Sequence, residues 1–167
     1  MATETQTKSG KNSKGSGQSE VIEGLNLLVA LAADLRSQVK QAHWTVVGPN
    51  FIALHKLFDE QAAILLAHVD LFAERVRALQ AIPEGTVRNA ADRSTLEEIE
   101  IGELNERDAV AAILDRFETY SGALDEAIMA ADEAEDLTTQ DIYIEAQRAA
   151  DLQAYFLRSH LPAKGRG

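Results

Sequence analysis

The chain has 167 residues, a formal net charge of −11 and no cysteine, which excludes disulfides, thiol catalysis and cysteine-ligated metal sites. Its length suits one domain with a real core, and its few aromatic residues and prolines suit packed helices better than short strands. No apolar run is long enough to span a membrane and the N-terminus lacks a signal-peptide stretch, so we expect a soluble cytoplasmic protein.

Residues 1–19 contain no large apolar side chain beyond Met1 and are rich in Gly, Ser, Thr and Lys. A segment of this composition cannot bury enough apolar surface to order itself. We therefore expect a flexible tail at 1–19, a folded domain at 20–161 and a short second tail at 162–167.

Apolar residues recur at helical spacing from residue 20 to the Gly48-Pro49-Asn50 break. Pro49 disfavours a helical Gly48, and Asn50 is a good N-cap for the helix that follows. Further helices are expected at about 51–80, 106–132 and 139–160.

The second and third of these helices are joined by a long connection at 81–105, where Ser94 and Glu97 match the capping box of a short helix. Four amphipathic helices with one long connection are typical of an all-α, ferritin-like four-helix bundle.

Negative charge is concentrated at 92–136, where fifteen side chains are acidic and three are basic. Such a surface repels a nucleic-acid backbone and attracts cations. For most of these carboxylates, however, a solvated surface with no further role is the ordinary expectation.

One face of the second helix carries a histidine and three carboxylates. At about 100° per residue, His55, Asp59, Asp70 and Glu74 fall on this face, and His68 falls on the opposite one. Asp59 and Asp70 lie about 16 Å apart along the axis, which is too far for one ion to bind both. His55/Asp59 and Asp70/Glu74 are therefore two half-sites.

Two copies that pack with their second helices antiparallel would join each half-site to the complementary half of the other copy. His43 lies just before the Gly48 break and can join the half-site of its own chain. Imidazole and carboxylate ligands suit Fe(II), Mn(II) or Zn(II). From spacing alone, the same residues are also compatible with an ordinary charged surface.

The stretch KQAHWTVVGPNFIALHKLFDE at 40–60, followed by HVDLFAER at 68–75, closely resembles the signature of Dps proteins (DNA-binding proteins from starved cells), the mini-ferritins. The helix pattern fits the same family over about 20–161, including FLRSHL near the end. The resemblance implies a di-iron ferroxidase site between subunits of a homo-oligomer, a hollow dodecamer with two-fold and three-fold interfaces. Its ligands would be His43, His55 and Asp59 of one chain and Asp70 and Glu74 of its neighbour.

The family oxidises Fe(II), preferably with hydrogen peroxide and otherwise with O2, and stores the ferric mineral, which protects DNA from oxidative damage. Zn or Mn can occupy such a site. Trp44 resembles a family tryptophan that absorbs stray oxidising equivalents, although packing at a subunit interface would also explain it. Many members carry a second tryptophan where this chain has Tyr155, which puts a two-tryptophan relay in doubt.

The resemblance also implies an iron-entry pore at the acidic turn before the last helix, with Asp136 and Asp141 as the candidate lining residues. DNA binding varies within the family, and here the candidate contacts are the tail lysines Lys8, Lys11 and Lys14, which would place the protein at the nucleoid. The alternative function is a DNA-binding, nucleoid-compacting shell with incidental metal binding. A bacterioferritin-like site inside one bundle would need Glu-x-x-His motifs, and the chain contains none.

Overall fold

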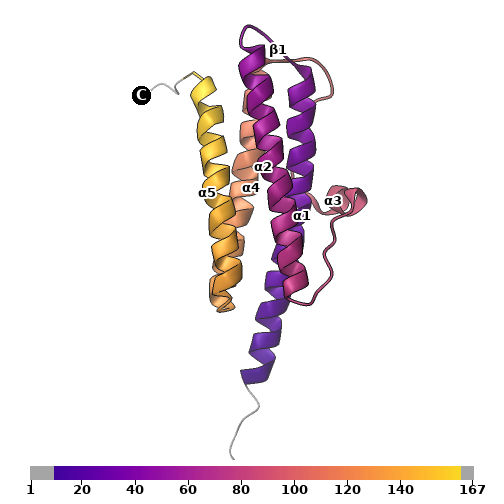
Figure 1. Ribbon diagram of the computed structural model, residues 1–167, viewed down its shortest axis with the longest axis vertical. Coiled ribbons are helices and arrows are strands. Elements are labelled where there is room, and N and C mark those ends of the chain that lie inside the picture. The colour runs from indigo at the N-terminus through magenta and orange to yellow at the C-terminus, as the bar shows by residue number, and fades with distance from the viewer. Residues whose placement is uncertain (1–9, 163–167) are drawn as a thin grey trace, which may run out of the picture.

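The computed structural model describes residues 10–162, with side chains from residue 16 onward. Figure 1 shows the main helices side by side in a bundle, with α3 (Val87–Arg93) beside it on the long connection. The bundle helices are α1 (Gly10–Thr45), α2 (Phe51–Ala78), α4 (Glu106–Glu133) and α5 (Leu137–His160). This arrangement confirms the predicted ferritin-like fold.

The core lies between the four long helices. Side chains spaced three or four residues apart form an apolar stripe on each helix, and the stripes meet in the middle of the bundle. The largest fully buried side chains include aromatic residues of α2, α4 and α5 and leucines of α1, among them Phe58, Phe72, Phe117, Tyr120, Tyr143, Leu28, Leu31 and Leu35. Burying a side chain of this size contributes about 1.5–3 kcal/mol, so this stripe holds the helices in register.

The corner between α1 and α2 is fixed by a contact from the start of α4. Strand β1 (Val46–Val47) pairs in parallel with β2 (Leu104–Asn105), which brings the end of the long connection beside the corner. The Glu106 carboxylate then accepts hydrogen bonds from the backbone and side-chain amides of Asn50. Asn50 does take the N-cap position of α2, but its side chain binds Glu106 and does not cap the helix.

The short helix of the connection begins earlier than the sequence predicts. Thr86 caps α3 by accepting a hydrogen bond from the Asn89 amide, and Ser94 ends this helix. The Ser94 hydroxyl donates to Asp34 on α1 and accepts from the Leu96 amide, and no helix begins at this residue. The connection is tied to α4 as well, because the nearly buried Arg116 donates to the Glu97 and Glu98 carbonyls.

The first helix is longer than predicted, since α1 begins at Gly10 and the sequence indicates a flexible tail as far as residue 19. Each residue added to an existing helix gains a hydrogen bond without a new nucleation cost. Gly17 also passes close to the α4–α5 turn, where a Cβ atom on it would lie 3.2 Å from the Cβ of Ala134. Figure 1 shows this end of α1 projecting below the bundle.

Residues 1–9 and 163–167 lie outside the described part of the chain, and with them Lys8 and most of the predicted C-terminal tail. Lys11 and Lys14 fall in the first two turns of α1. Among the described residues, none of the helices combines the length and hydrophobicity required to cross a lipid bilayer.

Candidate metal centre

The structure brings His43 and His55 together across the α1–α2 corner. Their rings stack with centroids 3.7 Å apart and planes 20° from parallel. Each ring also binds the backbone of the other residue, with 2.7 Å from His43 Nδ1 to the His55 carbonyl and 2.9 Å from His55 Nδ1 to the His43 carbonyl. The two residues therefore fix each other's orientation.

These hydrogen bonds determine which ring nitrogens can bind a metal. A carbonyl oxygen only accepts, so Nδ1 must carry a proton in both rings. In the neutral imidazoles the lone pair then lies on Nε2, the nitrogen left free for a metal ion. Donation from the other ring nitrogen to a carbonyl is the usual way in which proteins orient a metal-binding histidine.

Asp59 lies one turn after His55 on α2, but its carboxylate contacts a cation of the same chain. The Lys40 ammonium lies 2.6 Å from Asp59 Oδ1, and the Asp59 side chain is 61% exposed. The hydrogen bond and charge of Lys40 lower the pKa of Asp59 below its ordinary value, with smaller contributions from His43 and His55. Asp59 is thus an ionised, solvent-accessible carboxylate at neutral pH.

Trp44 follows His43 on α1 and is 67% exposed. Its ring lies next to the same lysine, with the Lys40 ammonium 5.8 Å from the ring centroid. This distance is within the range of a cation–π contact. Lys40 therefore links the tryptophan to the Asp59 half of the candidate site, a role that the helical spacing of the acidic residues and histidines did not indicate.

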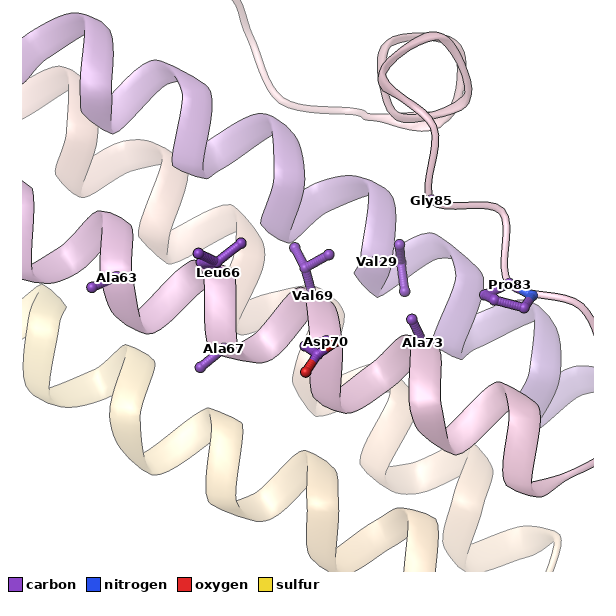
Figure 2. Close-up of a pocket in the computed structure, with 9 residues that line it drawn as sticks. All are labelled: Val29, Ala63, Leu66, Ala67, Val69, Asp70, Ala73, Pro83 and Gly85. Atoms are coloured by element: carbon purple, nitrogen blue, oxygen red, sulfur yellow. The ribbon is translucent and has the colours of Figure 1, made fainter.

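Asp70 and Glu74 are exposed on α2 and lie away from the histidine pair. Asp70 lines an open groove of about 590 Å³ beside the exposed Leu66, and the groove also takes in Pro83 and Gly85 after α2. Figure 2 shows Asp70 on α2 among apolar side chains, with Val29 of α1 nearby. Throughout residues 10–162, no three histidine or acidic side chains gather closely enough to hold a metal ion.

His68 points into the bundle, as its place on the helical wheel predicts. It is 6% exposed, and its Nδ1 lies 3.0 Å from the Tyr120 hydroxyl. Burial lowers the pKa of His68 to about 4. It takes no part in the exposed face that carries His55 and Asp70.

The two candidate pore residues differ in their surroundings. Asp136 caps α5 by accepting from the Thr139 amide and hydroxyl, and both of its oxygens also accept from Arg75. Burial acts to raise the pKa of Asp136, but the bonds from Thr139 and Arg75 outweigh it and hold that pKa below its ordinary value. Asp141, one turn into α5, is exposed.

The chain is similar to known ferritin-like proteins over most of its length. Residues 22–163 match the family of ferritin-like domains. A DNA protection during starvation protein of Agrobacterium fabrum is 35% identical over 88% of this chain and 91% of its own length. One of Mycolicibacterium smegmatis is 31% identical over 88% and 80%.

Solved structures give the same result. The crystal structure of Dps from Staphylococcus aureus matches with a TM-score of 0.83 and 30% identity, covering 88% of this chain and 98% of that one. The helical fold is thus shared with a solved structure of this group of ferritin-like proteins. The chain belongs to the Dps family.

Proposed function

We propose that this protein is a Dps-type mini-ferritin that oxidises Fe(II) at di-iron sites shared between two subunits. The observation that carries the proposal is the stacked His43/His55 pair, whose Nε2 atoms are free while both Nδ1 atoms are held by carbonyls. Two imidazoles alone are an incomplete ligand set for iron, and the exposed Asp70 and Glu74 of a second copy would complete it.

The groove beside Asp70 supports a subunit contact at this face. Leu66 in the groove is 52% exposed, and Ile82 and Val87 beyond α2 are 72% and 86% exposed. Exposed apolar side chains of this size mark association surfaces when they gather on one face. A two-fold contact at the groove would cover Leu66 and place each chain's carboxylates near the other chain's histidines.

Iron is the substrate, and the residues present fit it. Neutral imidazole nitrogens and ionised carboxylates are the ligands that Fe(II) accepts, and Mn(II) or Zn(II) would compete for them. Two Fe(II) ions would give two electrons to one H2O2, which with two protons forms two water molecules. The ferric product would be stored inside a dodecameric shell, and because both electrons pass together, no hydroxyl radical is released near DNA. O2 would serve as the slower oxidant.

The Lys40 ammonium occupies a place beside Asp59 where a metal cation would bind. Its ammonium contacts Asp59 Oδ1 directly, so an iron ion that takes this oxygen displaces it. The exchange replaces one positive charge by another and keeps the carboxylate ionised. Trp44, beside the same lysine, would intercept oxidising equivalents that escape the site.

For iron entry we propose Asp141 as the pore-lining residue, because its carboxylate is exposed and makes no bond within the described chain. Asp136 is the second candidate, and its bonds to Arg75 and Thr139 mean that it would act mainly by shaping the turn.

Mixing two inactive variants tests the shared site. His55→Ala removes the histidine half, and Glu74→Ala removes the carboxylate half. If the site lies between subunits, a heterodimer of the two variants has one site broken twice and one site intact. Co-refolding at equal amounts should therefore restore about a quarter of the parent's peroxide-dependent Fe(II) oxidation. A site contained in one chain predicts no recovery, and that result would refute the proposal.

The second candidate function is DNA compaction through the N-terminal lysines, including Lys8, Lys11 and Lys14. A shell would display many copies, which allows weak binding by avidity, while the charge of −11 opposes it. We expect a gel shift that weakens with salt and is lost when residues 1–19, which carry all three lysines, are removed. A shift that persists without them would show that this segment is not needed for DNA binding.

A further inference from the structure

A pocket of about 360 Å³ lies between α1 and the long connection. Residues one turn apart on α1 contribute to its lining, and they include Arg36, Lys40 and Trp44. Glu98 and Ile101 line it from the connection. Ligand pockets range from about 300 to 1,000 Å³, so the size of this one suits a small molecule.

Arg36 supplies a positive charge that no other group of the described chain neutralises. It makes no hydrogen bond or ion pair among residues 16–162, although the residue is half-buried and its Nε is buried without a partner. The other arginines of this range that make no such bond are exposed, so water satisfies them; they are Arg88, Arg107 and Arg148. A guanidinium carries only donors, and withdrawing it from water without an acceptor is costly. Arg36 is therefore the group of this pocket that can bind an anion.

The charges around Arg36 favour a ligand with a single negative charge. Lys40 is a second cation in the pocket, but its ammonium lies 2.6 Å from Asp59 Oδ1 and is neutralised there. Glu98 is exposed, lines the same pocket and makes no ion pair with Arg36. Its carboxylate repels anions, and a dianion twice as strongly as a monoanion. One free guanidinium beside one carboxylate thus favours a monoanion over phosphate.

Much of the remaining lining is apolar. Trp44 and Ile101 are 67% and 73% exposed, and Ile99 between the two walls of the pocket is buried at 2%. Apolar side chains beside a free cation fit a molecule with an apolar body and one charged end. The indole of Trp44 offers a flat face to an aromatic ring.

Both walls are held in place by contacts that involve no ligand. Arg116 donates to the carbonyls of Glu97 and Glu98 at 3.1 and 3.3 Å, which fixes the connection against α4. The Ser94 hydroxyl donates to Asp34, two residues before Arg36 on α1. A pocket that is already formed loses less conformational entropy when a ligand binds.

We propose that this pocket binds a small aromatic monocarboxylate. The Arg36 guanidinium holds the carboxylate through two parallel N–H···O bonds, and the ring of the ligand lies against Trp44 and Ile101. The side-chain amide of Gln41, which makes no bond within the described chain, is a further donor in the lining. All of these residues belong to one chain, so the proposal does not depend on the iron site shared between subunits.

Trp44 is the only tryptophan of the sequence, so its fluorescence reports on this pocket. The experiment titrates the iron-free, full-length assembly with phenylacetate, phenylacetamide, acetate and inorganic phosphate. We expect phenylacetate to change the fluorescence in a saturable way, with the same dissociation constant in equilibrium dialysis. Phenylacetamide lacks the charge, and acetate and phosphate lack the ring, so each should bind at least about ten-fold more weakly. No saturable binding of phenylacetate, or equal binding of any of the other three, would overturn the proposal.

Three substitutions locate the binding. Arg36→Gln should weaken phenylacetate binding at least about ten-fold. Arg148→Gln is the matched control, because it removes the same charge from an exposed position of α5 outside the pocket and should bind like the parent. Glu98→Gln removes the opposing carboxylate and should tighten binding about two- to five-fold.

Unchanged binding in Arg36→Gln, or an equal loss in Arg148→Gln, would refute an anion site at Arg36. Equal or weaker binding in Glu98→Gln would contradict a carboxylate bound beside Glu98. If Arg36→Gln does not assemble, the comparison of phenylacetate with phenylacetamide on the parent decides the question, because the two probes share a shape and differ in charge.

Discussion

Replacement of Asp136 separates a structural role from a pore role at the α4–α5 turn. Its two oxygens accept from the Thr139 amide at 3.1 Å and from Arg75 Nη2 at 2.9 and 3.1 Å. The Asp136 and Arg75 side chains are only 21% and 16% exposed. Asp136→Ala therefore removes a helix cap and also leaves a largely buried guanidinium without its carboxylate.

The expected loss of stability follows from these two contributions. A lost N-cap costs about 1 kcal/mol, and a lost hydrogen bond to a charged group costs about 1.5–3 kcal/mol. The free energy of unfolding should fall by about 2–4 kcal/mol in Asp136→Ala. Asp136→Asn keeps a capping side chain and loses the charge, so its free energy of unfolding should lie between those of Asp136→Ala and the parent.

The effect should also depend on pH. The pKa of Asp136 in the folded chain lies below its ordinary value, so its contribution to stability is complete above the unfolded value of about 3.9 and is lost as pH falls through the lower folded value. The difference between parent and Asp136→Ala should therefore be present at pH 7 and shrink below about pH 4.

Urea denaturation followed by circular dichroism measures this difference, at one fixed protein concentration because subunit association contributes to stability. Asp141→Asn is the matched control, since Asp141 is exposed and should leave the midpoint unchanged while slowing iron uptake. An unchanged midpoint in Asp136→Ala would refute the structural role and favour Asp136 as a pore-lining residue.

Two further substitutions test the half-site and its corner. Lys40→Gln removes the ammonium from Asp59, so the pKa of Asp59 should rise toward its ordinary value. Divalent cations should then bind about two- to five-fold more tightly in anaerobic titration. Lys40→Arg should resemble the parent, and equal or weaker binding in Lys40→Gln would contradict the replacement of Lys40 by the metal ion. Gly48→Ala places a Cβ 2.5 Å from Glu106 Cγ at a φ of +149°, so it should lower the free energy of unfolding by about 1–3 kcal/mol and weaken metal binding. Gly122→Ala, in an open position on α4, should raise stability instead, and similar effects in both variants would argue against strain at the corner.

The helices and the candidate ligands could be predicted because both depend on local spacing. The 3.6-residue period of apolar side chains predicts the bundle, and α2, α4 and α5 begin and end within two residues of the expected positions. The same period places His55 and Asp70 on one face of α2 and His68 on the other. The Pro49 break predicts the corner that brings His43 near His55, and the stacked rings follow from that corner.

Other features depend on contacts between distant segments, which spacing does not encode. Ser94 binds Asp34 instead of capping a helix, and α3 forms at Val87–Arg93. Gly17 lies against Ala134, and α1 extends back to Gly10.

The same limit applies at the functional residues. The sequence by itself determined which side chains share a face, because that is a property of one helix. The tertiary structure decided that Lys40 contacts Asp59, that Arg75 contacts Asp136, and that Tyr120 meets His68. Each of these pairs joins two helices, and their meeting depends on the packing of the whole bundle.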